Sequence, residues 1–236
     1  MPGYGDHCAT ARAAEILATR WTPLVVRNLL MGCRTFTEIR DGLPGISPTV
    51  LTERLRMLER VGVLDRGIGA SGHVVYDLTP TGLGLSEVVR AMSEWAERWL
   101  EPAPANYSAP MVLWKLSHLL GEDDLPPGRV VVHFDIRDDD RQHYWLLLHR
   151  PHREVCDRSP GAPDDVVVTT TGEWLTKWFA GHLSLAEAQR AGRIAVLATP
   201  PLERLLEGWG GLGSWLESPP EDSLLSAGAA VPTAAM

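Results

Sequence analysis

Hydrogen-bonding side chains recur at helical spacing between residues 48 and 60. At about 100° per residue they fall on one side of a helix. They are Thr49, Glu53, Arg56 and Arg60. Such a face can bind base-pair edges, because arginine donates two hydrogen bonds to guanine, glutamate accepts one from cytosine, and threonine contacts the thymine methyl group. The alternative is an ordinary amphipathic surface helix, for which a polar face is also expected.

The helix that carries these side chains has a well-defined beginning. Ser47 occupies the N-cap position, and Pro48 the first helical position, where its missing N–H costs nothing. Pro44-Gly45 predicts a turn before the cap, and a shorter helix precedes that turn. Apolar residues at i, i+4 and i+7 form the opposite, core-facing stripe, namely Leu51, Leu55 and Leu58. Helix, turn and second helix in this order predict a helix-turn-helix.

Two short β-branched and aromatic runs follow, at residues 63–66 and 74–78, around a Gly/Ser turn at 67–72. This pattern predicts a β-hairpin. A hairpin directly after the second helix is a wing, which can lie along a phosphate backbone. His73 stands just before the second run, where we expect at most a weak, pH-dependent phosphate contact.

A long and nearly ungapped set of positions matches one family pattern. The positions are Cys8, Arg12-Ala13, Arg20-Trp21-Thr22, Arg27, Leu29-Leu30, Gly32, Arg34, Phe36, Glu38, 43–48, 50–56, Leu58-Glu59, Gly62, Tyr76 and 78–80. On these residues the segment 8–100 resembles the HxlR-type winged helix-turn-helix regulators, a bacterial group similar to the MarR regulators. The resemblance implies a dimeric transcription factor whose second motif helix enters the major groove. The chain departs from the pattern in the wing, where Gly72-His73 replaces the usual proline and arginine.

The motif and the resemblance together give a set of candidate DNA-contacting residues. Val50 and Thr52 flank the polar face, and Arg54 lies on the shoulder of the buried stripe, within reach of a phosphate or an internal carboxylate. The full set is Arg34, Thr35, Ser47, Pro48, Thr49, Val50, Thr52, Glu53, Arg54, Arg56 and His73.

Thr79-Pro80 predicts the start of a long helix that ends at Leu100. Apolar residues recur along it at alternating steps of three and four, as a helix–helix seam requires. They are Leu85, Val88, Met92, Trp95 and Trp99. Two tryptophans are a large apolar surface for a small domain to cover alone, although the stripe can also pack on its own domain. We expect a homodimer through this helix, assisted by a helix at Ala9–Leu17, and therefore a pseudo-palindromic operator.

The composition is that of two modest domains. The chain has 236 residues and a net charge of −8. Residues 1–101 hold 11 arginines against 12 acidic residues, whereas residues 102–236 hold 11 basic against 18 acidic residues, so the acidity is concentrated in the second half. No apolar run approaches the ~18–20 residues of a membrane span. Three cysteines without a CxxC pair, and no recognisable signal peptide, indicate a cytoplasmic protein.

The pattern of predicted strands and helices in the second half is that of an α+β domain. We expect a winged helix-turn-helix domain at 1–101, a linker at 102–110, the α+β domain at 111–217 and a disordered tail at 218–236. The predicted strands are 130–137, 143–149, 154–158, 166–171 and 193–198, and the predicted helices are 111–120, 172–191 with a break near Gly181, and 201–209. Strands and helices in this succession predict a sheet covered by a helical layer.

A diffuse set of residues in this half matches a second family pattern. The set is 165–170, Trp174-Leu175, Ala180-Gly181, 185–188, 192–196 and Leu202 onward. On these residues the domain resembles the sterol-carrier-protein-type lipid-binding fold, which implies an apolar tunnel that accepts small hydrophobic molecules. Aromatic side chains suit a ligand pocket, although plain core is the commoner role. The candidate ligand-binding residues are Trp114, Trp145, Trp174, Trp178 and Trp209.

The resulting interpretation is a ligand-responsive DNA-binding transcriptional regulator, with repression as the default, and neither an enzyme nor a cofactor protein. No metal site is expected, because His149, His152 and Cys156 lack a fourth ligand. The alternatives are a carrier or enzyme of lipid-like molecules fused to a DNA-binding module, a second domain that serves only as a dimer scaffold, and a redox-sensing regulator that acts through Cys8. The sequence names neither the effector nor the target promoter.

Overall fold

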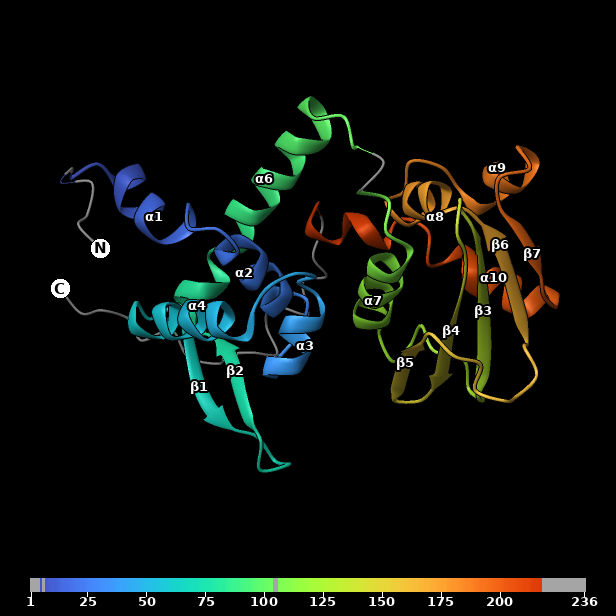
Figure 1. Ribbon diagram of the computed structural model, residues 1–236, viewed down its shortest axis with the longest axis horizontal. Helices are drawn as coiled ribbons and strands as arrows, with labels where there is room; N and C mark the ends of the chain where they lie inside the picture. The colour runs from blue at the N-terminus through green and yellow to red at the C-terminus, as the bar shows by residue number, and fades with distance from the viewer. Residues whose placement is uncertain (1–4, 6, 104–105, 218–236) are drawn as a thin grey trace. The chain divides into compact units, whose positions relative to one another are not determined.

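Residues 5, 7–103 and 106–217 are described by a computed structural model (Figure 1). The chain divides at Trp99–Leu100 into a first unit and a second unit, and the second ends at Trp215. We describe each unit by itself. The disordered tail expected at 218–236 lies outside the described residues. None of the helices in the described ranges is long and apolar enough to cross a bilayer.

The first unit is helical, with a single β-hairpin. Its elements are α1 (Ala9–Leu17), α2 (Thr22–Leu30), α3 (Phe36–Asp41), α4 (Pro48–Arg60), β1 (Leu64–Ile68), β2 (Val74–Leu78), α5 (Pro80–Leu83) and α6 (Ser86–Trp99). Helices α3 and α4 form the predicted helix-turn-helix. Strands β1 and β2 pair antiparallel, with Leu64 opposite Leu78, and form the predicted hairpin. The fully buried apolar residues at the centre of this unit include Val25, Val26, Ile39, Leu51, Leu58 and Leu64.

The prediction of one continuous helix from Thr79 to Leu100 is wrong, because the segment breaks between α5 and α6. The Thr79 hydroxyl donates a hydrogen bond to the Gly62 carbonyl and accepts one from the Gly82 backbone N–H. A Cβ at position 82 would lie 2.1 Å from the Val63 carbonyl oxygen, so only glycine permits this approach. The short helix α5 is therefore fixed against the start of the hairpin, and α6 begins as a separate helix.

The second unit is a five-stranded sheet with helices, as the α+β prediction requires. Its elements are α7 (Ala109–Leu119), β3 (Val130–Arg137), β4 (Arg141–His149), β5 (His152–Cys156), β6 (Val166–Thr170), α8 (Gly172–Phe179), α9 (Leu185–Arg190), β7 (Ala195–Leu197), α10 (Pro200–Glu207) and the 3₁₀ helix η2 (Leu212–Glu217). The strand order is β5-β4-β3-β6-β7. Strands β3 and β6 are parallel, and the other neighbouring pairs are antiparallel.

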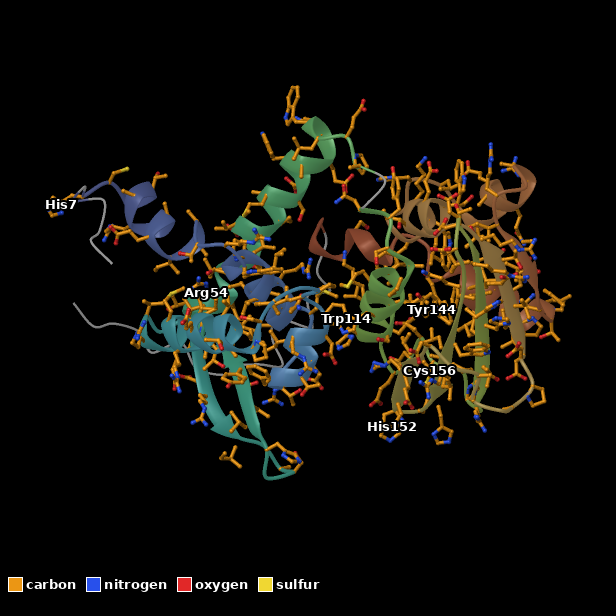
Figure 2. All side chains as sticks on the ribbon, in the orientation of Figure 1. His7, Arg54, Trp114, Tyr144, His152 and Cys156 are labelled. Carbon is orange, nitrogen blue, oxygen red and sulfur yellow. The ribbon has the colours of Figure 1, made fainter. Side chains whose placement is uncertain are left out.

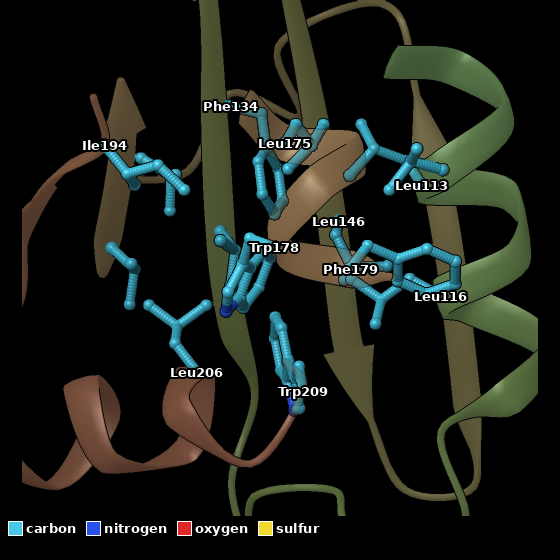
Figure 3. Close-up of a cluster of buried hydrophobic side chains, with 14 of the residues drawn as sticks. Leu113, Leu116, Phe134, Leu146, Leu175, Trp178, Phe179, Ile194, Leu206 and Trp209 are labelled. Carbon is cyan, nitrogen blue, oxygen red and sulfur yellow. The ribbon is translucent and has the colours of Figure 1, made fainter. Parts of the chain in front are cut away.

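One face of this sheet carries the core of the second unit (Figure 3). Side chains alternate along β3, so Phe134 and Ile136 point to one face while His133 and Asp135 point to the other. Phe134 packs in a single buried cluster with residues of α7, α8, α9 and α10, so these helices cover the same face. The alternation and the cluster together explain why Phe134 and Ile136 alternate with the polar residues His133 and Asp135 along β3.

The opposite face carries polar and aromatic side chains. The His133 and Trp145 rings stack with centroids 4.7 Å apart, and Asp164 accepts a hydrogen bond from the Trp145 indole at 3.0 Å. Asp135 is nearly buried between Arg137 and Arg141. Hydrogen bonds from Arg141 lower the pKa of the Asp135 carboxyl to about 2. This face is therefore held by side-chain hydrogen bonds rather than by a second helical layer.

Candidate nucleic-acid interface

Helix α3 is fixed at its beginning by its own side chains and by the hairpin. The Thr35 hydroxyl accepts a hydrogen bond from the Glu38 N–H, and the Glu38 carboxylate accepts one from the Thr35 N–H, which completes a capping box. Arg34 forms a two-pronged ion pair with Asp77 of β2, with the second contact at 2.7 Å. This pair raises the pKa of the Arg34 guanidinium. Arg34, predicted to contact DNA, therefore also joins α3 to the hairpin.

A buried polar network joins α2 to α3. The Asn28 side chain, fully buried, donates a hydrogen bond to the Ile39 carbonyl at 3.0 Å. Its oxygen accepts two hydrogen bonds from Arg27, which also donates to the Gly42 carbonyl. Burial lowers the pKa of the Arg27 guanidinium. The network satisfies the carbonyls at the end of α3 and sets the distance between the two helices.

Helix α4 presents the predicted polar face. Ser47 caps it by accepting a hydrogen bond from the Val50 N–H at 3.3 Å. Leu51, Leu55 and Leu58 are buried, as the spacing predicted. On the other side Thr49, Glu53, Arg56 and Arg60 are exposed together with Ser47 and Pro48, and Val50 is half-buried beside them. Within the described part of the chain, neither Glu53 nor Arg56 has a hydrogen-bond or ion-pair partner, so both side chains are available to an external partner.

Two other candidates on α4 are engaged within the chain. The Thr52 hydroxyl donates a hydrogen bond to the Pro48 carbonyl at 2.8 Å. Arg54 Nε donates to the Arg20 carbonyl at 3.1 Å, ahead of α2 (Figure 2). The neighbouring Trp21 has a left-handed backbone, with φ of 78°, which is strained for a large side chain. Arg54 thus holds α4 against the junction between α1 and α2.

The hairpin leaves its tip exposed. His73 and Gly72 lie at the turn, and His73 is exposed, as a phosphate contact would require. Ile68, at the end of β1, is also exposed. The bonds of Arg34 to Asp77 and of the Tyr76 N–H to the Arg34 carbonyl hold the base of the hairpin close to α3.

The predicted dimer stripe is on the surface of α6. Met92 is 49% exposed, Trp95 58% and Trp99 68%. Val88 is also exposed and Leu85 is half-buried, whereas Val89, beside the stripe, is buried in its own unit. A helix that exposes two tryptophans in one stripe has an apolar surface that its own unit leaves uncovered.

The five candidate tryptophans of the second unit do not gather in one place. Trp178 and Trp209 are buried in the core cluster, and Trp174 packs at its edge under Lys177 and Arg193. Trp145 lies on the opposite face of the sheet, because its neighbour Leu146 points into the core. Trp114 of α7 (labelled in Figure 2) lies outside the cluster and packs against His118, with the ring centroids 4.3 Å apart and the ring planes tilted by 34°. The candidate ligand set therefore reduces to Trp174, Trp178 and Trp209.

The three cysteines differ in environment. Cys8 is exposed just before α1, and hydrogen bonds from the Ala11 and Thr10 backbone lower the pKa of its thiol. Burial raises the pKa of Cys33 to about 12 and also raises that of Cys156. No group of three or more His, Cys, Asp or Glu residues suited to a metal ion occurs within the described residues.

Sequence reasoning missed Asn28, Asp77 and Arg20 as positioning residues. Asn28 gave the only indication, since together with Arg27 it interrupts the otherwise apolar run Leu24–Leu30. The roles of Asp77 and of the Arg20 carbonyl depend on contacts across the fold, which local spacing does not contain.

Comparison with known proteins agrees with this geometry. The HxlR-like helix-turn-helix family matches residues 16–104. The HTH-type transcriptional regulator YvaP of Bacillus subtilis (strain 168) is 38% identical over 94 residues, which are 39% of this chain and 87% of that protein. The chain belongs to the HxlR-like helix-turn-helix family.

Further relatives are similar over the same part of the chain. The HTH-type transcriptional regulator YodB of the same strain is 35% identical over 92 residues, 38% of this chain and 82% of that protein. The reduced form of YodB is similar to this HxlR-like chain with 32% identity and a TM-score of 0.36, over 42% of this chain and 99% of that one. This member of the HxlR-like family is a DNA-binding transcriptional regulator.

Proposed function

We propose that this regulator binds a pseudo-palindromic operator as a homodimer, and that its second unit binds a small hydrophobic effector. The observation that carries the first part is the face of α4, where Glu53 and Arg56 are exposed above a fully buried leucine stripe. In this proposal α4 lies in the major groove, and Thr49, Glu53 and Arg56 contact base edges.

The dimer is proposed to form through α6. HxlR-type regulators are typically dimeric, and the stripe at Met92, Trp95 and Trp99 gives this chain an apolar surface of the required kind. A two-fold axis through this helix gives two copies of α4, and each binds one half-site.

The effector part is supported by the layout of the second unit, a sheet with one helix-covered face, which fits the resemblance to sterol-carrier-type folds. In this proposal the unit acts by binding and carries out no reaction. Regulation requires that the effector has different affinities for two dimer geometries, and the spacing of the two α4 helices differs between them.

The first test is Arg56→Ala. We expect operator affinity to fall about ten- to hundredfold, because loss of a two-pronged base contact costs ~1–3 kcal/mol. Fluorescence anisotropy with the protein's own upstream intergenic duplex, against random competitor at low salt, measures this. The control is Arg158→Ala, at an exposed arginine of the second unit, which should change affinity by less than about twofold. Unchanged affinity in Arg56→Ala would remove this residue from base recognition, and no preference of the wild type for its duplex would refute the proposed function.

A second candidate function is redox sensing through Cys8. The observation that favours it is the lowered pKa of this exposed thiol, since the thiolate is the form that peroxide oxidises. In this step the thiolate becomes a sulfenic acid and the peroxide is reduced to water.

The test compares operator binding before and after peroxide treatment. We expect the wild type to change affinity and to recover after dithiothreitol is added, and Cys8→Ser to be insensitive. Cys33→Ala serves as the matched control, because burial keeps the Cys33 thiol protonated, and it should behave like the wild type. A Cys8→Ser variant that responds like the wild type would exclude this function.

A further inference from the structure

Two indole N–H groups are buried in the second unit without a hydrogen-bond acceptor. Trp178 and Trp209 are each 1% exposed, and the Nε1 atom of neither has a partner among the described residues. An unpaired buried donor costs about 1–3 kcal/mol, and buried polar groups in folded proteins are nearly always bonded. Two such donors in one core cluster indicate that an acceptor from outside the chain completes the site.

The two donors come from different elements but occupy the same layer. Trp178 belongs to α8, and Trp209 to the turn that follows α10. Both rings pack in the cluster that covers the helical face of the sheet. Figure 3 shows them one below the other beside β3, each with its nitrogen at the lower end of the ring. Both unpaired donors therefore belong to one buried cluster.

The turn after α10 keeps side-chain atoms away from the first donor. A Cβ at position 210 would lie 2.8 Å from Trp178 Nε1, which is hydrogen-bonding distance. Glycine is not needed there for a positive φ, since Gly210 is absent from the residues with that conformation. The turn is held in place by the Gly211 N–H, which donates to the Trp178 carbonyl at 3.2 Å. Glycine at 210 thus places no side-chain atom against the indole N–H. The Nε1 atom has almost no accessible surface in the chain alone, so an acceptor reaches it only when neighbouring atoms shift.

The charge of the surroundings limits what this group can be. Among the described residues of the second unit, the one charged side chain in the buried class is Asp135, on the opposite face of the sheet. A carboxylate in the core would therefore lie far from any buried cation, and an isolated buried anion is very costly. A cation or a pure donor cannot pair with an N–H. A neutral oxygen acceptor on an apolar body satisfies both conditions.

We propose that Trp178 and Trp209 form the polar end of an effector site that takes neutral carbonyl compounds, such as esters or ketones with a hydrocarbon chain. The proposal rests on the effector-binding role proposed above and specifies its chemistry. The hydrocarbon part lies among the apolar side chains of the cluster, and the carbonyl oxygen accepts from the indole N–H groups.

The experiment uses the full chain with nitrogen-15 in its nine tryptophans and three probes of similar length: methyl decanoate, undecane and decanoate. Trp178→Phe and Trp209→Phe assign the two indole resonances, and Trp95→Phe, at an exposed position, is the control for the method. We expect methyl decanoate to move these two resonances selectively and to bind at least about tenfold more tightly than undecane, the ratio that one hydrogen bond of ordinary strength provides. Decanoate should bind more weakly than its ester.

A glycine pair tests the position of the acceptor. Gly210→Ala places a methyl group 2.8 Å from Trp178 Nε1 and should lower ester affinity to that of undecane. The matched control is Gly208→Ala, whose Cβ meets nothing nearer than the Leu205 carbonyl oxygen at 3.4 Å, and it should bind the ester like the wild type. If Gly210→Ala does not fold, the comparison of the three probes on the wild type decides by itself.

Several results would overturn the proposal. They are equal affinity for ester and alkane, tighter binding of decanoate than of its ester, movement of other indoles only, and no binding of the ester, which would leave an ordinary internal water as the acceptor. Operator affinity is measured on the same samples. Intact operator binding with any of these results refutes the carbonyl site alone, whereas loss of sequence-specific DNA binding refutes the proposed function.

Discussion

We expect the replacement of Trp95 and Trp99 together by glutamate to convert the proposed dimer to a monomer and to lower operator affinity by more than about hundredfold. The two rings are 58% and 68% exposed within one chain. Each tryptophan buries about 150–250 Å² when it is covered, and a two-fold interface counts each twice. At ~25 cal/mol per Å², the loss amounts to several kcal/mol before the repulsion between the new carboxylates is added.

Analytical ultracentrifugation measures the dimer, and anisotropy with a two-half-site duplex measures binding. The control is Leu197→Glu, which introduces the same charge at an apolar position of the second unit that is 75% exposed. It should leave both the mass and the affinity unchanged. A double variant that remains a folded dimer would show that α6 is not the interface.

The helix-turn-helix could be predicted from the sequence because its determinants are local. Ser47 and Pro48 fix the start of α4 from within four residues, and the leucine stripe fixes which face is buried. The hairpin and the α1 bounds, Ala9–Leu17, were accessible for the same reason. In the second unit, runs rich in β-branched residues such as β3 and β6 indicated the strands, although not their order in the sheet.

What could not be predicted depends on contacts between distant segments. The break before α6 accompanies the close approach of Gly82 to the Val63 carbonyl. The local sequence pattern, a capped helix, does not predict this contact. Arg54 resembled a phosphate ligand in the sequence, but it holds the Arg20 carbonyl 34 residues away. Arg34 likewise forms an ion pair with Asp77, which lies 43 residues away in the sequence. In each case an exposed arginine had several possible partners, and only the fold selects one.

The positions of the candidate ligand-binding tryptophans also depend on contacts that local spacing does not contain. Trp174 and Trp178 stand four residues apart and so share one side of α8, yet Trp178 is buried in the cluster whereas Trp174 lies at its rim. The face of the sheet on which Trp145 lies depends on the register of β4, because a shift of one residue moves a strand side chain to the other face.

Replacing Asn28 by alanine destabilises the first unit by about 2–4 kcal/mol. The substitution leaves the Ile39 carbonyl without its donor and Arg27 without its principal acceptor, and it opens a cavity in a fully buried site. An unsatisfied buried group costs about 1–3 kcal/mol, and the cavity and the partly buried guanidinium add to this. Because the network sets the distance between α2 and α3, we expect operator affinity to fall as well.

Hydrogen exchange with mass spectrometry, as a function of urea, measures this loss separately for the two units. Amides of α2 and α3 should exchange about 30- to 1,000-fold faster, while those of β3 and β4 keep their protection, because 1.4 kcal/mol corresponds to a factor of ten. The chain's other asparagine, the exposed Asn106, provides the control Asn106→Ala, which should change neither. Asn28→Asp separates the two halves of the network: it keeps an acceptor for Arg27 but loses the donor to Ile39, so its protection should fall between wild type and Asn28→Ala. Wild-type protection in Asn28→Ala would contradict the role of the network in holding the motif.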